Sequence, residues 1–148
     1  MKRLIVIFTL LVFCFNSIGQ NLVPNNSFET VDTCDGYLQG GILLGFAPPW
    51  HSPSMGSADL FNTCSSYSGM SVPHNNFGYQ YPHTGNGYAG GAPDGEYLEI
   101  QLDSPLVAQQ TYCASYYVAL SNIVGVAINN LGMYFSDTNI YVSTSLFL

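Results

Sequence analysis

Positive charge is almost missing from this sequence. Among 148 residues, Lys2 and Arg3 are the only lysine and arginine, against nine acidic residues and three histidines. Binding of nucleic acid normally requires several lysine or arginine side chains that neutralise phosphates. A side-chain clamp for phosphate or sulfate requires the same residue types. The composition therefore argues against a nucleic-acid partner and leaves divalent cations as the natural counter-charge.

Sequence signatures of catalysis are also missing. The chain has no G-x-S-x-G nucleophile elbow, no HExxH metal motif and no cofactor motif. Glu96 and Glu99 are a candidate pair for glycoside hydrolysis, but their positions at the start and on the outer face of an expected strand indicate solubility instead. His74 and His83 are a candidate metal pair, with two exposed loop histidines as the simpler interpretation. We therefore expect no enzymatic activity.

The first 19 residues are typical of a secretory signal peptide. Two basic residues open the segment, residues 4–15 form an unbroken apolar run, and small residues precede a cleavage site after Gly19. A membrane anchor is the alternative, but the run is shorter than the roughly 20 apolar residues that cross a bilayer. A lipoprotein attached through Cys14 is disfavoured because Phe13 stands where a small residue is required. Residues 1–19 are thus predicted to be removed on export.

The exported segment, residues 20–148, contains neither lysine nor arginine. Loss of the two basic residues changes the formal net charge from −7 to −9. Its length suffices for one modest domain with a core. We expect it to be secreted, periplasmic or at the outer-membrane surface, with no transmembrane helix after signal cleavage.

Three cysteines remain after export. Cys34 and Cys64 lie in polar loop sequence, whereas Cys113 lies inside an expected strand. Because exported proteins fold in oxidising compartments, we predict a Cys34–Cys64 disulfide, with three reduced thiols as the alternative.

The clearest structural pattern lies in the second half of the chain. Apolar and polar residues alternate over residues 97–102 and again over 112–120, and Pro105 ends the first run. Residues 128–136 repeat the alternation, and Asp59–Asn62 is a candidate short strand. This period of two, with many β-branched and aromatic residues, predicts an all-β, antiparallel fold.

A family resemblance begins at the start of the exported segment. The run N-L-V-P-N-N-S-F-E at residues 21–29 is similar to the opening of bacterial jelly-roll modules of the galactose-binding-like and carbohydrate-binding type. Further on, P-W-x-S-P, V-P-x-N-x-F-G-x-Q and P-H-T-G-N-x-Y-A-G resemble secreted Bacteroidetes-type proteins in which such a module often precedes an OmpA-like domain or a sorting tail. The resemblance runs from about Asn21 to Asp137. It implies an antiparallel jelly-roll β-sandwich in the cell envelope.

The resemblance also carries two finer expectations. The glutamate after the phenylalanine often contributes to a structural calcium in those modules, and Glu29 matches that position; a solvated carboxylate is the alternative. A jelly roll needs roughly eight strands, and the sequence indicates about six or seven. We therefore expect the sandwich to be incomplete at the C-terminus.

Aromatic side chains supply the candidate binding residues. Trp50, the only tryptophan, is either a stacking platform for a sugar or a core anchor. Tyr79 and Tyr81 either line a groove or cover a sheet. The sequence thus predicts a non-catalytic surface module that binds a glycan or another peptidoglycan-associated envelope component. The alternatives are an architectural N-terminal domain of an OmpA-like envelope protein and, less favoured, a hydrolase fragment.

Overall fold

The computed structural model describes residues 19–34, 44–92, 95–125, 127, 129 and 131–141. The predicted signal peptide, apart from Gly19, lies outside the described residues, and so does the chain from residue 142 onward. Within the described part, no helix has the length and apolar character needed to cross a membrane.

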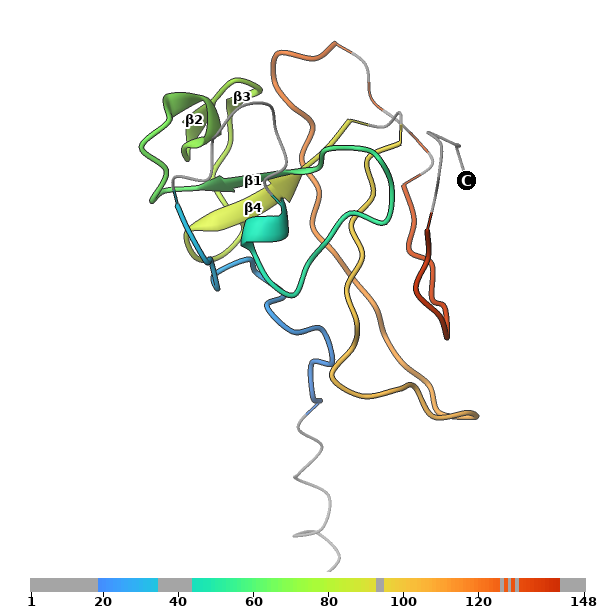
Figure 1. The fold of residues 1–148 in the computed structure, drawn as a ribbon. Helices are drawn as coiled ribbons and strands as arrows, with labels where there is room; N and C mark the ends of the chain where they lie inside the picture. The colour runs from blue at the N-terminus through green and yellow to red at the C-terminus, as the bar shows by residue number, and fades with distance from the viewer. Residues whose placement is uncertain are drawn as a thin grey trace, which may run out of the picture.

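Six short elements occur in the described chain, and none of them is an α-helix. They are η1 (Leu44–Phe46), β1 (Asp59–Asn62), η2 (Ser68–Met70), β2 (His74–Asn75), β3 (Gly78–Tyr79) and β4 (Gly87–Gly90). β1 pairs with β4, and β2 pairs with β3, both antiparallel. All six elements gather at one side of the molecule, and loops make up the rest (Figure 1). The predicted strand at 59–62 and the antiparallel β character are confirmed.

The hydrophobic core lies around β1 and η2. Its buried side chains are Ala47, Leu60, Phe61, Met70 and Val72. The Phe61 ring, only 3 % exposed, stacks on Tyr88 of β4 at 5.1 Å between ring centroids. A Cβ atom at Gly90 would come within 2.8 Å of that ring, so glycine is required where β4 passes it. The packing of β1 against β4 thus depends on the large ring of Phe61 and on the lack of a side chain at Gly90.

A disulfide joins the N-terminal segment to the chain just after β1. Cys34 and Cys64 are bonded, with Cα atoms 5.5 Å apart, which confirms the predicted pairing. Cys113 is an exposed free thiol and lies in no strand.

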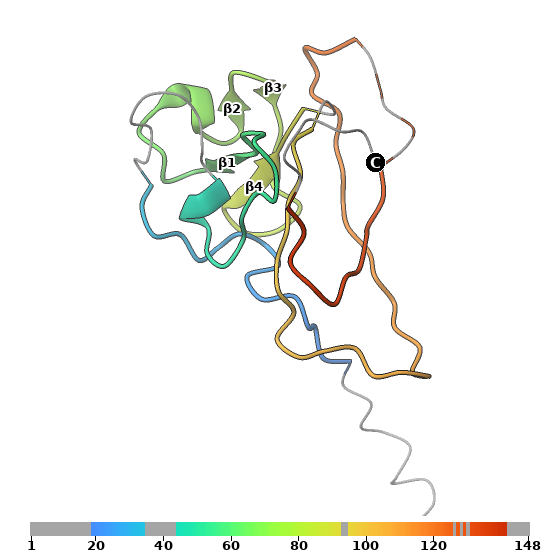
Figure 2. The ribbon, with the colours of Figure 1, turned by 45° about the vertical axis from the view of Figure 1, so that its right-hand side comes forward.

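The predicted strand pair at 97–102 and 112–120 is wrong. Figures 1 and 2 show residues 96–125 as two long runs of coil joined by a turn, and no strand pairing connects the two runs. We call this segment the long arm. Only Glu99 makes an isolated bridge, with His51. A period-two strand needs a second layer on its apolar face, and the apolar side chains here are exposed instead, including Leu98, Tyr112 and Val118.

The predicted strand at 128–136 is also not observed in its described part. Residues 131–136 belong to no strand, and Met133 and Phe135 are exposed. The described residues therefore form two small two-stranded sheets and extensive loops, without the two stacked layers of a sandwich.

Candidate functional site

The β2–β3 hairpin places the rings of His74 and Tyr79 next to each other on the surface. The two-residue turn 76–77 joins the strands, and the Asn75 side chain accepts a hydrogen bond from the second N–H of that turn at 2.9 Å. Gly78 has φ of +116°, a conformation that favours glycine. The resulting register sets His74 directly across from Tyr79.

We define the aromatic platform as His74, Tyr79 and Tyr81. The rings of His74 and Tyr79 are 4.5 Å apart at 77°, and those of Tyr79 and Tyr81 are 5.4 Å apart at 88°. Tyr79 is 43 % exposed and Tyr81 is 60 % exposed. The Tyr79 hydroxyl donates to the Tyr81 hydroxyl at 3.0 Å, and this bond is the main reason that the pKa of Tyr79 is raised. The structure thus brings together the two tyrosines predicted to bind a ligand.

A distant asparagine holds the platform in place. Asn122 accepts from the backbone N–H of Tyr79 at 2.9 Å and donates to its carbonyl at 3.1 Å. The Asn122 amide therefore bonds the edge of β3 in the way that the backbone of a neighbouring strand would. The neighbouring Ser121 hydroxyl donates to the carbonyl of Phe77. Residues 121–122 thereby attach the long arm to the hairpin.

Trp50 lies in a different set of contacts. Its indole N–H donates to the carbonyl of Asn25 at 2.8 Å, and its ring packs on Phe28 at 5.0 Å between centroids. Asn25 also uses its side chain to bond the backbone of Thr30 and Pro48. Trp50 therefore packs against the N-terminal turn, and none of its ring contacts involves the platform tyrosines. Its sugar-stacking role stays a prediction.

Glu29 anchors a loop in the structure. Its two carboxylate oxygens accept hydrogen bonds from the backbone N–H and side-chain amide of Asn86, at 2.7 and 2.8 Å. Gly85, with φ of +71°, leaves the space that the carboxylate fills, because a Cβ atom there would lie 2.2 Å from an oxygen.

These surroundings fit a calcium ion poorly. Calcium takes about six to eight oxygen ligands, and the donors around Glu29 are N–H groups. In the residues that the structure describes, no group of three or more His, Cys, Asp or Glu is placed to hold a metal ion. His74 and His83 belong to separate ring pairs, since His83 stacks on Tyr117 at 3.4 Å. Calcium at Glu29 stays a prediction.

Glu96 is a structural carboxylate, so its interpretation as a solubility residue is wrong. It accepts hydrogen bonds from the hydroxyl of Ser57 at 3.0 Å and from the backbone N–H of Ala92. Partial burial, and secondarily the charge of Glu96, raises the pKa of Asp59 at the start of β1 to about 6. Neutralising Asp59 therefore relieves both desolvation and like-charge repulsion.

This raised pKa predicts that Asp59 weakens the fold at neutral pH. The folded chain keeps the Asp59 proton up to about pH 6, whereas the unfolded chain releases it near 3.8. The stabilising contribution from protonation of Asp59 in the folded chain is fully present below about pH 4. It is lost as the pH rises through about 6. Without screening the shift would amount to ~3 kcal/mol. Solvent around the half-buried group reduces the expected gain of Asp59→Asn at pH 7.5 to about 1 kcal/mol.

Urea unfolding of both proteins at pH 4 and pH 7.5 measures this effect. The difference between variant and parent should appear at pH 7.5 and shrink at pH 4. Asp137→Asn, at an exposed position, is the matched control and should change stability by less than about 0.5 kcal/mol at either pH. An Asp59→Asn protein that is less stable than the parent at pH 7.5 would contradict the assignment.

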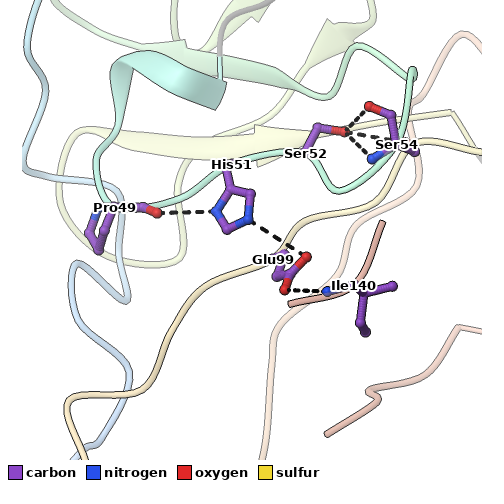
Figure 3. Close-up of polar contacts among 6 residues, drawn as sticks. All are labelled: Pro49, His51, Ser52, Ser54, Glu99 and Ile140. Atoms are coloured by element: carbon purple, nitrogen blue, oxygen red, sulfur yellow. Dashed lines mark hydrogen bonds and ion pairs between the residues drawn. The ribbon is translucent and has the colours of Figure 1, made fainter. Parts of the chain in front are cut away.

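A second polar cluster surrounds Glu99 (Figure 3). The Glu99 side chain is only 17 % exposed; one oxygen accepts from the backbone N–H of Ile140 at 3.1 Å, and the other lies 3.6 Å from Nε2 of His51. Backbone hydrogen bonds of 3.0 and 2.9 Å join the same two residues, His51 and Glu99. Glu99 thus connects three chain segments, so its interpretation as a solubility residue is wrong too.

Among the described residues, no side-chain hydroxyl or thiol forms a hydrogen bond with the His51 ring. Nδ1 of His51 faces the carbonyl of Pro49 at 3.5 Å (Figure 3). The nearby Ser52 hydroxyl bonds within its own turn, to the carbonyl of Gly56 at 3.1 Å. A nucleophile is activated by a base within hydrogen-bond reach, and Ser52 makes no such bond to His51. The contacts shown hold the segments of His51, Glu99 and Ile140 together.

Sequence reasoning missed three of these contacts. The ring contact of His74 could have been found, because a two-residue turn in H-N-N-F-G-Y places His74 opposite Tyr79. The attachment of Asn122 to Tyr79 has no local signal, since 43 residues separate the partners. The same applies to Glu96 and Ser57.

Comparisons of this chain with family models, curated proteins and solved structures found no match. Its function has to be inferred from its own residues.

Proposed function

We propose that this chain is a non-catalytic, exported β module of the jelly-roll class that binds glycans through the aromatic platform. The observation that supports it is the pair of exposed, perpendicular rings of Tyr79 and Tyr81, with the backbone of Tyr79 held by Asn122. Sugar rings have apolar faces that pack on aromatic rings, and tyrosine adds a hydroxyl for orientation. The rings are preorganised, so little side-chain entropy is lost on binding.

Two further observations support the class and the compartment. Both described sheets are antiparallel, as in jelly rolls. The Cys34–Cys64 disulfide agrees with folding in the periplasm, at the outer-membrane surface or outside the cell.

A glycan array probed with the full chain tests this function. We expect Tyr81→Ala to weaken binding by at least about tenfold, because truncating a central aromatic contact typically costs more than 1 kcal/mol. Tyr134→Ala removes a more exposed tyrosine outside the platform and should leave binding unchanged. Binding should survive a chelator, because Glu29 is occupied by Asn86; loss of binding in EDTA would instead favour the calcium prediction. A chain that binds no glycan would contradict the proposal.

One observation favours a second candidate, an architectural domain of an OmpA-like envelope protein. The segment 104–136 has no Asp, Glu, Lys, Arg or His, and many of its large apolar side chains are exposed. Apolar surface of this kind normally contacts another surface. An OmpA-like domain in the reading frame beyond codon 148 would support this candidate.

A further inference from the structure

We propose that the aromatic platform selects uncharged glycans and rejects those that carry carboxylate or sulfate groups. This inference rests on the proposed function and narrows its ligand to neutral pyranose units. It comes from the shape of the platform combined with the charge of the exported chain.

The shape suits one flat sugar ring. Because the rings of Tyr79 and Tyr81 meet at 88°, a pyranose that stacks on one of them meets the other as a wall. His74 stands at 77° to Tyr79 and extends the aromatic surface. The Tyr81 hydroxyl accepts from Tyr79, which leaves its own hydrogen to donate to a sugar hydroxyl. All of these contacts are apolar or neutral.

The charge of the chain excludes an acidic ligand. An anionic sugar is normally held by arginine or lysine through charge-assisted hydrogen bonds, and residues 20–148 contain neither residue type. The same segment carries all nine acidic side chains, so its field repels anions. The platform residues His74, Tyr79 and Tyr81 include neither lysine nor arginine. A uronic, sialic or sulfated unit therefore meets repulsion without a compensating partner.

The test compares matched neutral and sulfated oligosaccharides at pH 8 by titration calorimetry with the full chain. We expect the sulfated ligand to bind at least about tenfold more weakly. Gln80→Lys adds a cation at an exposed position beside Tyr81 and should raise affinity for the sulfated ligand by about tenfold while changing neutral binding less than threefold. Gln80→Met, which is uncharged and of similar length, is the control and should raise neither affinity.

The outcomes separate this inference from the proposed function. Equal or tighter binding of the sulfated ligand that is lost in Tyr81→Ala would overturn neutral selection and leave glycan binding in place. If Gln80→Lys does not raise the affinity for the sulfated ligand, neutral selection by charge is overturned and glycan binding is left in place. If neither ligand binds at all, the proposed function itself fails. Preference for the neutral ligand, lost in Tyr81→Ala and relaxed in Gln80→Lys, supports the inference.

Discussion

Replacing Phe61 by alanine is expected to lower the free energy of unfolding by about 3–5 kcal/mol, the usual cost of truncating a buried phenylalanine. The Phe61 ring stacks on Tyr88 and meets the edge of Phe77 at 5.6 Å. It also covers Gly90, so its removal leaves a cavity between β1 and β4 that the short strands have few side chains to fill. A domain with 5–15 kcal/mol of total stability would lose a large share of it.

Phe135→Ala is the matched control for this prediction. Phe135 is 54 % exposed and lies outside the core cluster, so its truncation should cost less than about 0.5 kcal/mol. Urea unfolding followed by tryptophan fluorescence measures the stability of both variants. Trp50 reports on the core because it packs on Phe28, which itself packs against the core cluster. Equal losses in the two variants would mean that the second half of the chain is buried as deeply as β1.

The two halves of the chain differ in how well the sequence predicts them. In residues 59–62, local pattern and tertiary environment agree: Leu60 and Phe61 are buried and β4 supplies a partner. In residues 112–120 the period-two pattern is stronger, yet no ladder forms. Alternation shows that a segment is suited to a sheet, but hydrogen bonds require a neighbouring strand and burial requires a facing layer. Neither requirement can be read from the segment itself.

The candidate site shows the same division. Tyr79 and Tyr81 could be named from composition, because exposed aromatics near glycine-rich loops are typical of binding surfaces. The ring contact between His74 and Tyr79 follows from the register of a two-residue hairpin, which local sequence partly encodes. The attachment of Tyr79 to Asn122 depends on a long-range contact, and the burial of Glu96 and Glu99 depends on loops that fold over them. The sequence therefore predicts both glutamates to be solubility residues, whereas the structure shows that both connect separate chain segments.

The second large effect is expected from the disulfide. Replacing both Cys34 and Cys64 by serine should lower the free energy of unfolding by about 3–4 kcal/mol, because the cross-link closes a loop with a sequence separation of 30 residues in the unfolded chain. The bridge is also the covalent tie between the N-terminal segment, which carries Phe28, and the chain just after β1. Losing it should therefore loosen the packing of Phe28 against the core.

The double variant is preferable to a single one, because a lone Cys34 or Cys64 could pair with the exposed thiol of Cys113. Cys113→Ser is the control and should change stability by less than about 0.5 kcal/mol, since Cys113 is exposed and unpaired. Urea unfolding of the parent with and without reductant gives an independent measure of the same loss. A reductant effect below about 1 kcal/mol, together with a double variant as stable as the parent, would show that noncovalent contacts alone hold the N-terminal segment on β1. In that case the hydrogen bond from the Asn25 side chain to the carbonyl of Pro48, with the packing of Phe28 against the core, would be the principal attachment.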